Sequence, residues 1–172
     1  MEDENVLKWY DPGTSKEDAD KIFLREWTRD YHYRVTLQKE GMESTAGYGT
    51  TKQGCKRLVE ELPRIFKQYG IKSVLDAACG DFYYMEDVDL TGINYIGIDF
   101  VQDQIEKNQE KYPQYDFRVL NMVADVMPNA DLVISRDTLI HISNTNIRRF
   151  LQSGIASGCK YLLTTNFPEI TN

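Results

Sequence analysis

The sequence predicts an α/β protein built on a mostly parallel, doubly wound sheet of about five strands flanked by helices. Short apolar runs alternate with longer segments whose apolar residues recur at helical spacing. Two of these runs, Ser73–Leu75 and Tyr95–Ile98, are each followed by an aspartate, and a turn of small residues lies between them. Parallel strands joined by helical crossovers give this alternation.

Length and charge limit the class of protein. The 172 residues suffice for one domain with a hydrophobic core. Hydrophobic residues at 41% and charged residues at 27% are ordinary for a soluble globular protein. The net charge of -7 argues against non-specific binding to nucleic acid, because Lys and Arg must neutralise phosphates in such binding.

The N-terminus is acidic and carries no apolar leader, and no later run approaches the length of a membrane span. We therefore expect a cytoplasmic protein that does not enter a membrane. Cys55, Cys79 and Cys159 are an odd number without metal-ligand spacing, which predicts free thiols. The two histidines complete no zinc pattern, so we expect no metal site.

The N-terminal part, residues 1–50, is expected to hold an extended arm, a helix and a loop. Residues 1–14 form the arm, and a capping box followed by apolar residues at helical spacing predicts a helix over Lys16–Tyr33. Gly41–Thr51 contains three glycines and several hydroxyl side chains, so it is a flexible loop. It is either a lid over a ligand site or a plain connector.

Residues 51–172 are expected to form the compact domain. Lys52–Tyr69 carries one apolar stripe and precedes Gly70, a typical C-cap, so it predicts a helix packed on the sheet. A helix is also expected between the first two strands. The later helices and strands are predicted at Val101–Tyr112 (helix), Phe117–Leu120 (strand), Ala130–Ile134 (strand), Thr138–Ile142 (start of a helix) and Tyr161–Thr165 (strand).

The turn between the first two strands indicates the ligand. Asp76 stands where a dinucleotide-binding turn needs bare backbone, and its carboxylate would repel a phosphate. It suits a ligand that carries an ammonium and a sulfonium group. Asp99 ends the next strand about twenty residues on, where a carboxylate can accept the hydroxyls of a ribose. The two acids favour S-adenosylmethionine over NAD and make a nicotinamide-dependent oxidoreductase a distant alternative.

Residues 44–167 resemble a class I S-adenosylmethionine-dependent methyltransferase, with VLDAACGD as the first motif and YIGIDF as the second. At the usual glycine positions of the family stand Ala78, Gly80 and Phe82, so only the middle glycine is kept. The large Phe82 side chain must point away from the ligand or stack beside it. The resemblance implies a Rossmann-like sheet with strand order 3-2-1-4-5, preceded by the N-terminal helical extension.

The resemblance also implies the cofactor, S-adenosylmethionine, which becomes S-adenosylhomocysteine as product. The family often has an acid at position 121 for the adenine amino group; Asn121 keeps a carbonyl acceptor there, and Met122 can lie against the adenine face. The cofactor-binding residues implied are Asp76, Ala77, Ala78, Gly80, Asp81, Asp99, Phe100, Asn121, Met122 and Arg136.

The segment after the fourth strand is where the family places residues that meet the transferred methyl group and its acceptor. Asp137 and His141 are the candidate catalytic bases by location, and a helix beginning at Thr138 would put them one turn apart. Asp137 can instead cap that helix. The acceptor stays open: a small molecule, a protein side chain or a modified nucleotide.

A complete member of the family has seven strands, and this chain reaches only a few residues past the fifth. An apolar edge strand pairs with something, so we expect a homo-oligomer, a partner chain or cover by the N-terminal segment. Two further functions remain: a catalytically silent S-adenosylmethionine-binding regulatory subunit, and an enzyme that cleaves S-adenosylmethionine without an acceptor.

Overall fold

A computed structural model of the chain describes residues 35, 41, 43–46 and 48–165. The predicted arm over residues 1–14 and the predicted helix Lys16–Tyr33 lie outside the described residues, and the Gly41–Thr51 loop is described in part.

The core of the fold is one parallel sheet. Its strands, in spatial order, are β3 (Asp116–Val119), β2 (Asn94–Asp99), β1 (Ser73–Ala77), β4 (Leu132–Ser135) and β5 (Tyr161–Thr164). Every pairing between neighbours is parallel. The predicted order 3-2-1-4-5 and the doubly wound class are therefore confirmed.

Helix α2 (Lys52–Tyr69) has the predicted bounds. Thr51 caps its start, because the side chain of Thr51 accepts the amide of Gly54 at 3.2 Å. Gly70 ends it in the left-handed conformation, with φ 64°, as the sequence predicts. Its apolar stripe buries Cys55, Leu62 and Phe66.

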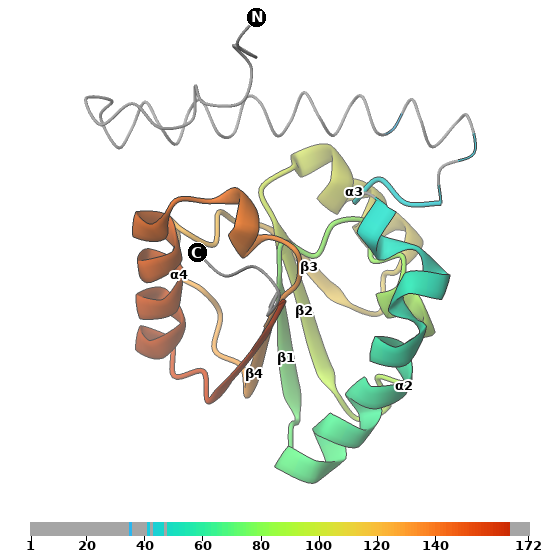
Figure 1. The fold of residues 1–172 in the computed structure, drawn as a ribbon, viewed down its shortest axis with the longest axis horizontal. Helices are drawn as coiled ribbons and strands as arrows, with labels where there is room; N and C mark the ends of the chain where they lie inside the picture. Colours follow the sequence, from blue (N-terminus) through green and yellow to red (C-terminus); the bar gives the residue numbers. More distant parts are fainter. Residues whose placement is uncertain (1–34, 36–40, 42, 47, 166–172) are drawn as a thin grey trace, which may run out of the picture.

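Helices cover both faces of the sheet, with α2 and α4 (Asn144–Ala156) on opposite sides in Figure 1. Helix α3 (Gln102–Lys111) shares the α2 face, where its Ile105 joins the same buried cluster as Phe66. On the other face, Phe150 of α4 belongs to a second cluster. This separation follows from the strands, whose successive side chains point to opposite faces.

The prediction of a helix between the first two strands is wrong. The connection holds a single 3-10 turn, η2 (Met85–Asp87). Three residues just after β1 have left-handed backbone, which a helix cannot include, and a Thr91-Gly92 turn precedes β2. The apolar side chains between them are buried at irregular spacing, namely Phe82, Tyr84, Met85, Val88 and Leu90.

The segment after β4 also differs from prediction. The residues expected to begin a helix at Thr138 form only the 3-10 turn η3 (Leu139–His141), and α4 begins separately at Asn144. Ser143 caps α4, because its hydroxyl accepts the amide of Asn146 at 3.2 Å. A third 3-10 turn, η1 (Tyr48–Thr50), precedes α2.

The described strands leave β3 and β5 at the two edges of the sheet. Tyr161 and Leu162 of β5 are 44% and 42% exposed. On α4, which covers the neighbouring face, Ile155 is also exposed. None of the helices in the described part of the chain has the length and apolar character needed to cross a membrane.

Candidate cofactor site

Buried polar side chains gather at the carboxyl edge of the sheet. Those buried in the described part of the chain are Ser44, Thr45, Asp76, Asp99, Gln104, Asn108, Ser135 and Thr138. All belong to the carboxyl ends of β1, β2 and β4, to the segments that follow β2 and β4, or to the loop before α2. In open parallel sheets, ligands bind at this edge, where the strand order reverses. The sequence predicts the same edge.

The loop after β1 has three residues in left-handed conformation, Ala78 with φ 68°, Gly80 with φ 54° and Phe82 with φ 59°. These are the positions at which the resemblance expects glycines. The backbone shape is thus present although only one glycine is, at a cost of about 1 kcal/mol for each non-glycine residue. The amides of Ala78 and Cys79 both donate to the carbonyl of Ile98 at 2.9 Å, which fixes the loop against β2.

Phe82 points into the core. Its side chain is 1% exposed, and its ring lies 4.7 to 5.4 Å, between centroids, from the rings of four aromatic residues. These are Tyr95, Tyr112, Tyr115 and Phe117. Of the two orientations that the sequence allows, the structure therefore has the one that faces away from the loop's ligand side.

Asp76 is a buried carboxyl group at the end of β1, only 3% exposed. Its Oδ2 accepts the Tyr95 hydroxyl at 2.8 Å. Burial raises the pKa of Asp76 to about 7, against the opposing effects of the Tyr95 hydrogen bond and the Arg136 charge. Asp76 therefore changes its charge near neutral pH.

Asp99 joins the ends of β2 and β1. Its Oδ2 accepts the amide of Gly80 at 3.2 Å, and its Oδ1 accepts the amide of Val101 at 3.0 Å. The two acids that the sequence singles out therefore flank the same loop. Phe100 follows directly and is half-buried, and Ala77 is fully buried in β1.

Asp81 holds the described segment Ser44–Ala46 against the loop. Its Oδ1 accepts the Ser44 hydroxyl at 2.9 Å, and its Oδ2 accepts the Thr45 amide at 2.7 Å. Ala46 then lies so close to Gly80 that a Cβ on Gly80 would be 2.8 Å from the Cβ of Ala46. Gly80 is thus favoured by its φ and required by this contact.

Asn121 and Met122 follow β3. The side-chain carbonyl of Asn121 accepts the amide of Val123 at 3.0 Å, and the backbone amide of Asn121 donates to Asp125 at 2.8 Å. The Asn121 carbonyl is thus engaged in a local turn. Met122 is 8% exposed and packs in the cluster on the α4 face.

Arg136 and Asp137 form an ion pair after β4, with Nη2 and Oδ2 3.1 Å apart. Arg136 Nη2 also donates to the carbonyl of Gly49 at 2.7 Å, and the guanidinium lies 5.4 Å from the ring centroid of Tyr84. Asp137 has φ 52° and exchanges two 2.8 Å hydrogen bonds with the Thr165 hydroxyl. Asp137 caps neither η3 nor α4.

His141 lies at the end of η3 and is exposed. The helix that would place it one turn beyond Asp137 is not formed, so that geometric argument for pairing them no longer holds. Their catalytic roles stay predictions.

One of the cysteines, Cys79, lies in the loop after β1 and is buried. Burial raises the pKa of the Cys79 thiol well above its ordinary value, so Cys79 is protonated at neutral pH. All three cysteines are free, as predicted. The described residues include no group of three or more His, Cys, Asp or Glu side chains arranged to hold a metal ion.

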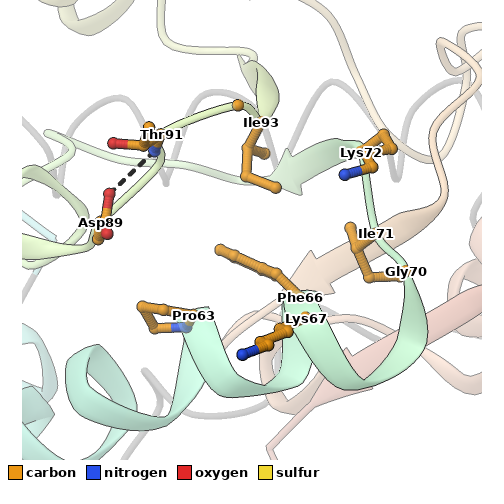
Figure 2. A pocket seen from close by; sticks show the side chains of 10 residues that line it. Pro63, Phe66, Lys67, Gly70, Ile71, Lys72, Asp89, Thr91 and Ile93 are labelled. Atoms are coloured by element: carbon orange, nitrogen blue, oxygen red, sulfur yellow. Dashed lines mark hydrogen bonds between the residues drawn. The ribbon is translucent and has the colours of Figure 1, made fainter.

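An open groove lies at the opposite edge of the sheet (Figure 2), with a volume of about 290 Å³. Pro63, Phe66 and Lys67 of α2 line one side, and the segment Asp89–Ile93 before β2 lines the other. It lies at the amino ends of β1 and β2, away from Asp76 and Asp99. It therefore forms no part of the candidate site.

Sequence reasoning missed several polar residues at the site, namely Ser44, Thr45, Tyr84, Tyr95, Gln104 and Asn108. A signal existed for two of them. Gln104 and Asn108 are four residues apart and share a helix face with Ile105, so they interrupt the buried face of α3 with amides. For Ser44 and Thr45 no periodic pattern indicates burial.

Comparisons with known proteins agree with this architecture. Residues 75–154 match the family model described as a methyltransferase domain. No curated protein matches the sequence.

Among solved structures, the chain is similar to magnesium protoporphyrin IX methyltransferase from Synechocystis PCC 6803 with bound S-adenosylhomocysteine. The TM-score is 0.57 at 18% identity, over 78% of this chain and 68% of that one. The same enzyme with bound S-adenosylmethionine gives a TM-score of 0.54 at 21% identity, over 69% and 59%. A TehB-like methyltransferase from Corynebacterium glutamicum ATCC 13032 Kitasato gives 0.53 at 16% identity, over 79% and 68%.

The chain spans about 59% of the length of the S-adenosylmethionine-bound Synechocystis structure. At these identities the likeness extends to the fold, and the sequence match to the methyltransferase domain is independent of it. The chain therefore carries a match to a methyltransferase domain over residues 75–154, and its fold is similar to that of solved S-adenosylmethionine-dependent methyltransferases.

Proposed function

We propose that this chain binds S-adenosylmethionine over the carboxyl ends of β1, β2 and β4 and transfers its methyl group to an acceptor. The observation that carries the proposal is the left-handed loop around Gly80, which follows the buried Asp76 and is held by the hydrogen bond from the Gly80 amide to the buried Asp99. The Synechocystis structures, which share the fold, hold S-adenosylmethionine and S-adenosylhomocysteine.

The residues at this edge fit such a ligand. A buried acid at the loop favours a cationic group over a phosphate, and it leaves nicotinamide dinucleotides disfavoured. Two buried polar atoms of the described residues have no hydrogen-bond partner, Ser135 Oγ and Arg136 Nη1, and both lie at the end of β4. The proposed cofactor-binding residues are Asp76, Ala77, Ala78, Gly80, Asp81, Asp99, Phe100, Asn121, Met122 and Arg136.

When bound, the cofactor supplies an electrophilic methyl group on a sulfonium. The protein then has to orient the acceptor and exclude water. An acceptor hydroxyl or ammonium must also lose a proton, and Asp137 is proposed to receive it, with His141 as the second candidate. The support for Asp137 is its fixed carboxylate, held at Oδ2 by Arg136 and at Oδ1 by Thr165.

A calorimetric titration of the chain with S-adenosylhomocysteine tests the proposal, with NAD as the matched control ligand. We expect saturable binding of S-adenosylhomocysteine and none of NAD. Incubation with S-adenosylmethionine and candidate acceptors then separates methyl transfer from binding alone. A folded chain that binds NAD, or neither ligand, contradicts the proposal.

A second candidate is a catalytically silent binding subunit that completes a partner. The exposed apolar side chains Tyr161 and Leu162 on the edge strand β5 favour an assembly of some kind. We propose that this assembly is a homodimer, in which two copies of the chain pair through β5.

The three free cysteines fit a reducing compartment, so we place the protein in the cytoplasm.

A further inference from the structure

A line of buried hydrogen bonds crosses from the segment before α2, through α3, to the loop after β1. The Thr45 hydroxyl lies 2.9 Å from Gln104 Oε1, Gln104 Nε2 lies 2.9 Å from Asn108 Oδ1, and Asn108 Nδ2 lies 2.7 Å from the carbonyl of Gly80. Thr45, Gln104 and Asn108 are 5%, 4% and 2% exposed, so water does not compete for these bonds.

The carbonyl of Gly80, at the end of this line, determines which group donates and which accepts in each of the three hydrogen bonds. A backbone carbonyl only accepts, so the amide nitrogen of Asn108 faces Gly80 and its oxygen faces Gln104. Gln104 must then donate to Asn108, which leaves its own oxygen toward Thr45. The Thr45 hydroxyl hydrogen is therefore directed at Gln104.

Asp81 holds the segment Ser44–Ala46 without using the hydrogen of the Thr45 hydroxyl. The Thr45 hydroxyl oxygen is 3.1 Å from Asp81 Oδ2, but its single hydrogen points to Gln104. Asp81 is satisfied by the Thr45 amide and the Ser44 hydroxyl. Ser44–Ala46 is thus attached twice, once to Asp81 and once through α3 to the carbonyl of Gly80.

We propose that Thr45, Gln104 and Asn108 are positioning residues, whose hydrogen bonds make Ser44–Ala46 and the left-handed Gly80 turn adopt their ligand-binding geometry together. This inference rests on the proposed function for the identity of the ligand. Ala46 packs directly on Gly80, so a displacement of Ser44–Ala46 changes the loop surface that receives the cofactor.

A matched pair of substitutions tests the role of the Thr45 hydroxyl. Thr45→Val keeps the shape and removes the hydroxyl, whereas Thr45→Ser keeps the hydroxyl. We expect Thr45→Val to weaken S-adenosylhomocysteine binding about fivefold, the effect of one neutral hydrogen bond, and Thr45→Ser to bind as the wild type does. Equal affinities for the two variants and the wild type overturn the proposal.

A double substitution separates coupling from general damage. Gln104→Met removes the amide at similar length. If the residues act as one line, Thr45→Val added to Gln104→Met costs much less affinity than Thr45→Val alone. Independent, additive losses in the double variant overturn the coupling.

Hydrogen exchange of the chain without ligand gives a readout that does not depend on the cofactor. Asn108→Ala should accelerate exchange at Thr45 and Ala46, because Asn108 is linked to that segment through Gln104 and through the Gly80 turn. If the wild type binds no S-adenosylhomocysteine but exchange accelerates, the proposed function fails and the line stands. Unchanged exchange at Thr45 and Ala46 in a folded variant overturns the line.

Discussion

Asp99, the last residue of β2, accepts a hydrogen bond from the backbone amide of Gly80 at 3.2 Å. The acid at the end of β2 therefore holds the turn that follows the neighbouring strand, β1. The second oxygen of Asp99 accepts the amide of Val101. One carboxylate therefore sets both the shape of the loop and the start of the segment that leads into α3.

Replacing Asp99 should damage cofactor binding far more than replacing Asp137. Asp99→Ala leaves two backbone amides without their acceptor, which costs about 1 to 3 kcal/mol, and also removes the carboxylate proposed to meet the ribose. Asp137→Ala should spare binding and reduce turnover. Titration with S-adenosylhomocysteine measures both, and equal loss of binding would show that the site is misplaced.

Asp76 should make cofactor binding depend on pH near neutrality. Its pKa of about 7 means that it is largely neutral at pH 6 and ionised at pH 8, and only the ionised form attracts an ammonium group. We expect tighter S-adenosylhomocysteine binding at pH 8 than at pH 6. Asp76→Asn should remove this difference; a variant with the wild-type pH dependence would assign it to another group.

Asp76 should also make the stability of the fold depend on pH, but in the opposite direction to cofactor binding. Because the pKa of Asp76 is raised above its unfolded value of 3.8, its contribution is fully present below pH 3.8 and is lost as pH rises through about 7. Thermal unfolding of wild type and Asp76→Asn at pH 5 and pH 8 measures it. The variant should gain relative to the wild type at the higher pH.

Replacing Ala78 with glycine should make the fold more stable. Its φ of 68° is strained for a residue with a Cβ, so Ala78→Gly should stabilise the fold by up to about 1 kcal/mol. Phe82 has a similar φ, yet Phe82→Gly should destabilise by about 3 kcal/mol or more, because it empties the aromatic cluster. Denaturant unfolding of both variants gives the comparison, and a loss of stability in Ala78→Gly would contradict the strain.

Asp131 should stabilise the edge of the sheet opposite the site. It accepts the amides of Lys72 and Ser73 and pairs with Lys160 at 2.7 Å, and these contacts lower its pKa to about 2. Its contribution is present above pH 3.8 and is lost as pH falls toward 2. Asp131→Ala should destabilise by about 1 to 3 kcal/mol at pH 7.

The exposed ion pair between Asp116 and Arg118 provides the control for Asp131. Asp116→Ala should cost less than about 1 kcal/mol, since exposed pairs contribute little. Equal losses of unfolding free energy in the two variants would contradict the structural role of Asp131.

Association through β5 should be broken by a charge on its exposed side chains. Leu162→Lys places an ammonium on the edge strand, which disfavours pairing with a second copy. Sedimentation velocity across a concentration series should show dimers for the wild type and monomers for the variant. A wild type that stays monomeric at high concentration would remove β5 pairing from the proposal.

Much of the fold could be predicted because its signals are local. Helix α2 has an apolar stripe and a glycine cap, and its bounds agree with prediction at both ends. The connection from β1 to β2 could not, because three left-handed residues hold it in an irregular path and only one of them is a glycine. The propensities of alanine and phenylalanine give no sign of such a conformation, and the sign that existed was that Ala78 and Phe82 stand where the resemblance expects glycines.

Some residues of the candidate site could likewise be predicted from local sequence patterns, and others could not. Asp76 and Asp99 end strands, so their place at one edge of the sheet follows from the alternation of strands and helices. The attachment of Ser44 and Thr45 to Asp81 joins residues 36 or more positions apart, and short polar side chains carry no pattern that indicates such a contact.

The ring cluster around Phe82 bears on the thermodynamics of ligand binding. A turn rich in glycine samples many conformations when empty, and a ligand must restrict them at an entropic cost. Here Phe82 is fixed at the far end of the turn by four neighbouring rings. The turn is therefore preorganised by the hydrophobic core, and a ligand that binds to it gains affinity because little conformational freedom remains to be lost.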